Sequence, residues 1–120
     1  MSLQLTRSHV TGDSDVHLIA SGDVTVKDLP LETSNPLDQA LPNWPSKKIL
    51  IDFSRVGYVD SSAIGWLISC QKNCRRAGGQ LVLHSISPSV RQVLDLLRIG
   101  KVVPLAEDQK AGEILLGVTV

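Results

Sequence analysis

The chain has too few cysteines for a disulfide framework. Its only two among 120 residues are Cys70 and Cys74. They lie four positions apart on one predicted helix, where their side chains are neighbours but the geometry is poor for a bridge. Metal or redox chemistry at this pair is disfavoured. A reducing cytoplasm is the simplest location for such a protein.

An excess of charge of one sign is also lacking. The 12 basic and 12 acidic side chains give a formal net charge of zero. The Lys and Arg residues are scattered and form no basic stripe of the kind that binds nucleic acid. No apolar run approaches the ~18–20 residues that cross a membrane, and residues 1–7 lack the apolar core of a secretory signal. We expect a cytoplasmic protein with no nucleic-acid partner and no direct membrane insertion.

Motifs for catalysis and cofactor binding are missing too. No GxSxG elbow surrounds Ser61, no glycine-rich P-loop is present, and no set of His, Cys and Asp has metal-ligand spacing. The sequence shows no base for Ser61, although a base that only the fold brings close would not be visible in it. We therefore expect no catalytic residue, no metal and no cofactor, and interpret the chain as a non-enzyme.

What the sequence does contain is the composition of one globular domain, which we place over residues 1–120. With 42% hydrophobic and 20% charged residues, a chain of this length can form a core without disulfides or metals. It is organised around residues 49–67. An apolar run within Lys48–Phe53 predicts a central strand buried on both faces, followed by a short irregular segment.

Asp60-Ser61-Ser62 then opens a predicted helix that continues to about Ala77. Asp and Ser are the residues best able to satisfy the unpaired N–H groups of a first turn, so each of the three is a candidate N-cap. The positive end of the helix dipole also favours a phosphate on Ser61 or Ser62, against partial repulsion from Asp60. Taken alone, the tripeptide also fits a capped helix with no further function.

The flanking segments predict an α/β pattern. Residues 3–10 and 16–20 are predicted to form an antiparallel strand pair, with His9 and His17 on the sheet surface. Arg75 and Arg76 complement the end of the helix, and glycines at 78 and 79 terminate it. Residues 80–84 form a strand parallel to the central one, because a helix connects the two.

Weaker signals cover the remaining segments. After Ser87-Pro88 a helix is predicted to end at Gly100 and to bury the set Val90, Val93, Leu94 and Leu97. Residues 102–105 are predicted as an edge strand and 111–116 as one or two helical turns. Prolines interrupt residues 26–47, where a short helix is expected from Pro36 through Leu41.

Several of these segments together carry a family resemblance. Residues 49–52, followed by the run Val59-Asp60-Ser61-Ser62-Ala63-Ile64-Gly65-Trp66-Leu67, resemble the signature of the STAS domain. This module is shared by bacterial anti-sigma factor antagonists and the cytoplasmic tails of sulfate transporters. Residues 78–83, 87–94 and 97–103 also match, so the similarity covers roughly residues 16–105. The resemblance implies an α/β fold, a single STAS-like domain with a mixed, mostly parallel β-sheet and helices packed on it.

The resemblance also implies an anti-sigma factor antagonist-like binding module that is switched by serine phosphorylation. Ser61 matches the family's modified residue, and Ser62 is the second choice. The implied partners are an anti-sigma factor serine kinase and a serine phosphatase, while the oligomeric state stays open. The residues predicted to bind the partner are Asp23, Asp60, Ser61, Ser62, Ala63 and Trp66. In the family, the acid matched by Asp52 lies close to the serine-bearing loop.

Two points remain open within the resemblance. The family usually has a further Asp after the segment matched by residues 21–24, where this chain has Thr25, with Asp28 three residues later. This departure favours an alternative function, a non-phosphorylated subunit of a membrane transport complex or signalling scaffold. Trp66 is either an exposed partner anchor or a side chain that packs on the proline-rich loop, in which Trp44 is expected to pack onto the domain.

Overall fold

The computed structural model describes residues 4–10, 15–24 and 46–116. The helix expected from Pro36, and the residues Thr25, Asp28 and Trp44, lie outside these ranges. The described elements are, in chain order, β1 (Gln4–Val10), β2 (Asp15–Val24), β3 (Lys48–Val59), α2 (Ser61–Ala77), β4 (Gln80–His84), α3 (Pro88–Leu96), the 3-10 helix η2 (Ile99–Lys101), β5 (Leu105–Ala106) and α4 (Gln109–Leu116).

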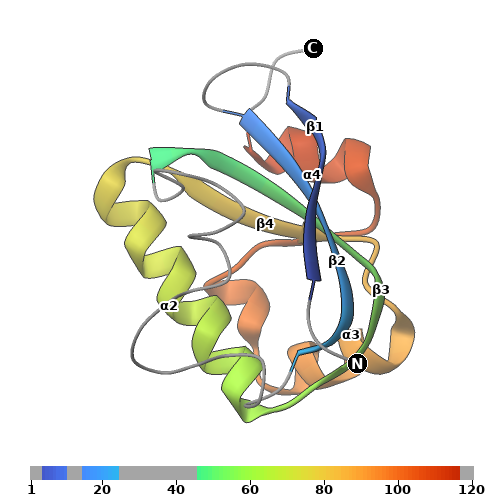
Figure 1. Ribbon diagram of the computed structural model, residues 1–120. Helices are drawn as coiled ribbons and strands as arrows, with labels where there is room; N and C mark the ends of the chain where they lie inside the picture. The colour runs from blue at the N-terminus through green and yellow to red at the C-terminus, as the bar shows by residue number, and fades with distance from the viewer. Residues whose placement is uncertain (1–3, 11–14, 25–45, 117–120) are drawn as a thin grey trace.

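The strands form one sheet in the order β1-β2-β3-β4-β5. β1 and β2 are antiparallel, whereas β2 through β5 run parallel, which confirms the predicted mixed, mostly parallel sheet. Figure 1 shows α2 and α4 on opposite sides of this sheet. The crossover from β3 to β4 carries α2, and the crossover from β4 to β5 carries α3.

The side chains of β3 alternate between the two faces of the sheet. Ile49, Ile51 and Phe53 point into the larger core cluster, which also contains buried side chains of α2 and α3. Leu50 points to the other face and packs in a smaller cluster with Val82 and Leu116 of α4. Both faces are therefore covered, which is why the strand begins as a continuous apolar run instead of alternating with polar residues.

β3 extends beyond the apolar run from which the central strand was predicted. β4 accompanies it only as far as Asp52. From Arg55 to Val59 its partner is the end of β2. The irregular segment that we predicted after residue 53 is therefore wrong. The pairing that makes it a strand is nonlocal, and it includes a register shift beside Gly22, whose φ of 92° suits glycine. A two-stranded ribbon thus carries the chain to the start of α2.

Gln71 fixes α2 on the sheet. Its side-chain amide donates to the carbonyl oxygens of Leu81 (3.1 Å) and Val102 (2.9 Å), and its carbonyl accepts from the Leu81 N–H (2.9 Å). This buried side chain therefore links α2, β4 and the segment after α3. The helix ends at Gly78, which adopts a left-handed φ of 86° and donates to the Cys74 carbonyl, as the glycine pair predicted.

The segment after β4 corrects three expectations. α3 buries Val90 and Leu94 but leaves Val93 and Leu97 exposed, because so short a helix buries only the narrow stripe that faces the core. The helix ends at Leu96, and the left-handed Arg98 (φ 57°) starts η2, so Gly100 does not terminate α3. The edge strand is β5 at residues 105–106, later than predicted, because η2 and its cap occupy residues 98–102.

α4 covers the second face of the sheet and confirms the helical turns expected near residue 111. It approaches β3 closely at Gly112, where an added Cβ would collide with the Leu50 Cδ1 atom. His17 of β2 lies beneath α4 with 5% of its surface exposed. Our placement of this histidine on the sheet surface is therefore wrong, since its strand position alone did not reveal the covering helix. The side chain of His9 is outside the description.

Gly112→Ala should destabilise the protein, because the new methyl group must displace a core side chain. Overpacking of this kind costs about 1–3 kcal/mol, more than the helix propensity gained. Gly65→Ala is the matched control: its Cβ meets nothing within 4 Å, so stability should rise by about 0.5–1 kcal/mol. Urea unfolding measures both, and a Gly112→Ala protein as stable as wild type would contradict the close approach.

Candidate functional site

The start of α2 is capped by Asp60. This residue is extended (φ −115°, ψ −174°), and its Oδ1 accepts a hydrogen bond of 3.1 Å from the Ala63 N–H. Its carbonyl accepts from the Ile64 N–H at 3.3 Å, the first bond of the helix. Of the three candidate caps, the structure therefore selects the carboxylate. The hydroxyls of Ser61 and Ser62 are not used for capping.

The two serines differ in access to solvent. Ser61 is the first residue of the helix and is exposed, whereas Ser62 is half-buried. The first turn contains no acidic side chain, so the negative charge beside Ser61 comes from the cap, Asp60. A group attached to Ser61 would reach solvent at the positive end of the helix dipole.

The ribbon brings the end of β2 to the same place. Asp23 pairs with Tyr58 and Val24 with Val59, directly before the cap. The backbone of Asp23 therefore lies beside the residues that lead into α2, as the predicted site requires. Four of the predicted partner-binding residues, Asp23, Asp60, Ser61 and Ser62, gather at one end of the sheet.

Two other predicted contact residues point into the core. Ala63 is fully buried and Trp66 is 9% exposed, and both belong to the larger core cluster. Trp66 follows Ala63 by three residues and precedes Cys70 by four, which places all three on one buried stripe. The interpretation of Trp66 as an exposed partner anchor is therefore wrong, while contact of this part of α2 with a partner stays a prediction. The sequence alone did not show how wide the buried face of α2 is.

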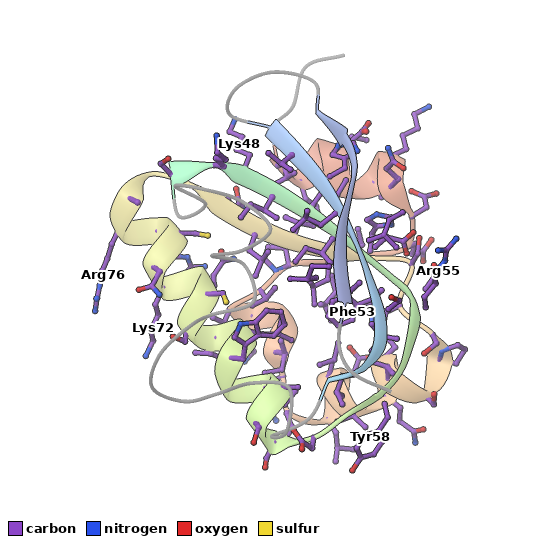
Figure 2. All side chains as sticks on the ribbon, viewed as in Figure 1. Lys48, Phe53, Arg55, Tyr58, Lys72 and Arg76 are labelled. Atoms are coloured by element: carbon purple, nitrogen blue, oxygen red, sulfur yellow. The ribbon has the colours of Figure 1, made fainter. Side chains whose placement is uncertain are left out.

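The opposite side of α2 is open. Ser61, Gly65 and Ser69 are exposed along it, followed by the cations Lys72 and Arg76. Figure 2 shows Lys72 and Arg76 projecting away from the helix and the sheet. Gly65 has an ordinary helical φ and open space around it, so neither backbone conformation nor packing requires glycine here.

Two exposed side chains, Tyr58 and Leu97, were missed by the sequence reasoning. Tyr58 is 56% exposed two residues before the cap, and Figure 2 shows it projecting beside α3. Leu97, at the end of α3, is 53% exposed. The exposure of Tyr58 follows from its position beyond the end of β4, where β3 is paired with β2, and this position depends on the sheet register.

Asp52 is not part of this site. Its Oδ1 accepts a hydrogen bond of 2.8 Å from the Ser54 N–H, and its strand partner is His84. Eight residues of extended chain, on the order of 25 Å, separate it from Asp60. The placement of this acid near the serine-bearing loop is therefore wrong for this chain.

The two cysteines lie inside the core beneath α2. Both are free thiols, and burial raises the pKa of Cys74 from 9.0 to about 11. This thiol is therefore protonated, and weakly nucleophilic, at neutral pH. Across the described ranges, no group of three or more His, Cys, Asp and Glu side chains is placed to hold a metal ion. Likewise, no helix there is long and apolar enough to cross a membrane.

The fold and the capped serine site define the class of protein. The family model of the STAS domain matches residues 18–111, and the chain belongs to that family. Among curated relatives, the anti-sigma F factor antagonist of Paenibacillus polymyxa is 23% identical over 109 residues, which cover 91% of each chain.

Solved structures have the same fold. A crystal structure described as an anti-sigma factor antagonist of Thermotoga maritima has a TM-score of 0.77 at 21% identity, with 94% of each chain covered. The anti-sigma factor antagonist SpoIIAA matches in its unphosphorylated form (TM-score 0.58, 19% identity, 95% of this chain and 94% of that one). The phosphorylated form of SpoIIAA, from Bacillus, matches with a TM-score of 0.56 at 18% identity, covering 95% of this chain and 99% of that one.

Removal of the Asp60 cap should lower the stability of the protein. Asp60→Ala leaves the first-turn N–H of Ala63 without its partner and should lower the free energy of unfolding by about 1 kcal/mol, within a range of 0.5–2. Asp60→Asn keeps a capping oxygen and is the matched control, expected to stay near wild type. Thermal and urea unfolding measure the difference. Equal losses in both variants would show that the carboxylate acts through its charge and not as a cap.

Proposed function

We propose that this protein is an anti-sigma factor antagonist whose partner binding is switched by phosphorylation of Ser61. The proposal rests on the different roles of two neighbouring residues at the start of α2. Asp60 caps the helix, so the exposed hydroxyl beside it can be modified without loss of the helix terminus. Ser62 remains the second choice, because its half-buried position gives a kinase less access.

The switch follows from charge. Unmodified, the start of α2 presents a small neutral hydroxyl, which a partner can cover at little desolvation cost. A phosphate adds about −1.5 to −2 charges, which must then be buried in the same contact, so the partner is released. The helix dipole stabilises the phosphate in the free protein, against partial repulsion from Asp60. Modification therefore changes binding far more than it changes the fold.

The partners that fit this site are an anti-sigma factor serine kinase, which binds and modifies the serine, and a phosphatase, which restores it. The relatives support this assignment, because SpoIIAA has been solved with and without phosphate. Such a regulator acts in the cytoplasm and needs no catalytic residue of its own. Thr25, where the family usually has Asp, bears on how the kinase engages the end of β2.

The partner surface extends from Ser61 along the exposed side of α2. Glycine in a helix interior costs about 1 kcal/mol relative to alanine, and nothing in the described part of the fold requires it at position 65. A backbone that another protein approaches closely does require it. Gly65 lies one turn after Ser61 on the same side, so we place the partner against both residues.

Ser61→Asp should weaken binding of the anti-sigma kinase roughly tenfold or more, because it buries an unpaired charge in the contact. Ser61→Ala should bind like wild type. Ser89→Asp, which adds the same charge at an exposed position in the first turn of α3, controls for net charge and should also bind. Titration calorimetry with the kinase measures all three. Equal binding by Ser61→Asp and Ser61→Ala would favour the transport or scaffold subunit.

Gly65→Ala should separate stability from binding. The variant should unfold at higher temperature yet bind the partner about tenfold more weakly, since one added methyl in a close-packed contact costs about 1–3 kcal/mol. The same calorimetric titration, paired with a melting curve, gives both values. Unchanged affinity in the stabilised variant would remove Gly65 from the contact while leaving the Ser61 proposal standing.

A further inference from the structure

A second polar cluster lies on the other face of the sheet, under α4. His17 on β2 and His84 on β4 are each 5% exposed, and β3 runs between their strands. The register pairs His17 with Leu50 and His84 with Asp52, so the four side chains share one face. By contrast, the described buried side chains of the opposite face are apolar, except for Gln71.

Polar groups of α4 contact one of these histidines, His17. The Gln109 amide nitrogen lies 3.1 Å from Nδ1 of His17, and Glu113 Oε1 lies 3.6 Å from its Nε2. Gln109 also donates to Glu113 Oε1 at 3.2 Å. Nδ1 of His84 lies 2.8 Å from the Ser85 hydroxyl oxygen. α4 is therefore in polar contact with His17, while the printed partner of His84 is Ser85, the residue that follows β4.

The apolar contact that holds α4 is small. Its cluster contains four buried side chains, against twenty in the larger cluster of the described residues. On the outer side of α4, Ile114 is 71% exposed and Leu115 is exposed as well. A helix of 8 residues has little stability of its own. The position of α4 therefore depends on its contacts with the sheet, including those with His17, on the face where His84 is also buried.

We propose that α4 is a pH-sensitive latch: at mildly acidic pH, His84 takes up a proton, and the buried charge favours release of α4 from the sheet. The charged and titratable groups around His84 are Asp52 from β3, His17 from β2, and Asp108 and Glu113 from the start and body of α4. β5 contributes the uncharged Ala106 as its strand neighbour. The carboxylates favour the proton, whereas burial and the second histidine oppose it.

The direction of the pH effect follows from the linkage between proton binding by His84 and docking of α4. Burial, partly offset by Asp52, lowers the pKa of His84 from its usual 6.5. When α4 is released the ring is hydrated and binds a proton more readily. The docked state is therefore fully favoured above about pH 6.5, and it is lost progressively as the pH falls below that value. For one proton, the docking equilibrium changes by at most about tenfold per pH unit.

The latch is independent of the proposed phosphorylation switch. Asp52 lies beside His84 on the sheet, whereas Asp60 lies on the order of 25 Å further along β3. α4 and the start of α2 also lie on opposite sides of the sheet (Figure 1). Release of α4 can therefore be measured without a partner protein, and its failure leaves the Ser61 proposal untouched.

Hydrogen exchange of the full chain between pH 7.5 and 5.5, corrected for intrinsic exchange rates, tests the latch. The protection of α4 amides should fall several-fold to tenfold per pH unit below about 6.5, while amides of β3 and α2 keep theirs. Glu113→Gln removes a carboxylate that favours the protonated ring, so its α4 should lose more protection at pH 5.5 and stay close to wild type at pH 7.5. Protection of α4 that does not change with pH overturns the proposal.

His84→Asn removes the titrating ring and should flatten the pH dependence; a variant that keeps the full dependence also overturns the latch. If this substitution prevents α4 from docking at any pH, the wild-type imidazole remains measurable by NMR among the three histidines of the chain. Its titration midpoint should lie below 6.5. A midpoint at or above 6.5 would mean that the docked state accepts the proton, which contradicts the mechanism.

Discussion

Burial of β3 on both faces is the constraint on which the rest of the structure depends. Its apolar residues alternate between two helical layers, so α2 and α3 must pack on one side and α4 on the other. Its neighbours β2 and β4 run parallel to it, which requires crossovers and fixes where each helix begins. Both the serine site and the histidine cluster are positioned by this one strand.

The serine site depends on the length of β3 beyond the rest of the sheet. Among the described residues β2 alone pairs with β3 after Asp52, so the strand projects as a ribbon, and the turn into α2 stands at its tip. Ser61 and the end of β2 therefore lie close together at this tip. The cap by Asp60 keeps this exposed helix terminus intact, so the serine itself is available for another role.

The histidine cluster lies on the other face of the sheet, where the contact with the covering helix is of a different kind. On the α4 side the sheet buries two imidazoles among carboxylates, and the apolar contact is small. Buried polar groups are costly unless satisfied, so they make the docking of the covering helix conditional. The α2 side is held instead by a large apolar cluster and by the hydrogen bonds of Gln71, none of which titrates near neutral pH.

Local signals explain what could be predicted. The βαβ unit, the start of α2 at residues 60–62 and its end at Gly78 follow from periodicity, capping chemistry and glycine, which act within a few residues of chain. The exposure of Leu97 and the burial of Trp66 could not be predicted in the same way. The helical period shows which residues lie on the same side of a helix. It does not show how much of the helix surface the neighbouring elements bury.

The sequence by itself therefore determined the strand and helix order, the family and the candidate serine. Only the tertiary structure decided which of three residues caps α2, how far β3 extends and which side chains are buried. The paired segments 21–24 and 55–59 are separated by some thirty residues of chain. Likewise, α4 contacts His17 although the two are distant in the sequence. Such contacts are set by the packing of distant segments, which no local pattern of residues records.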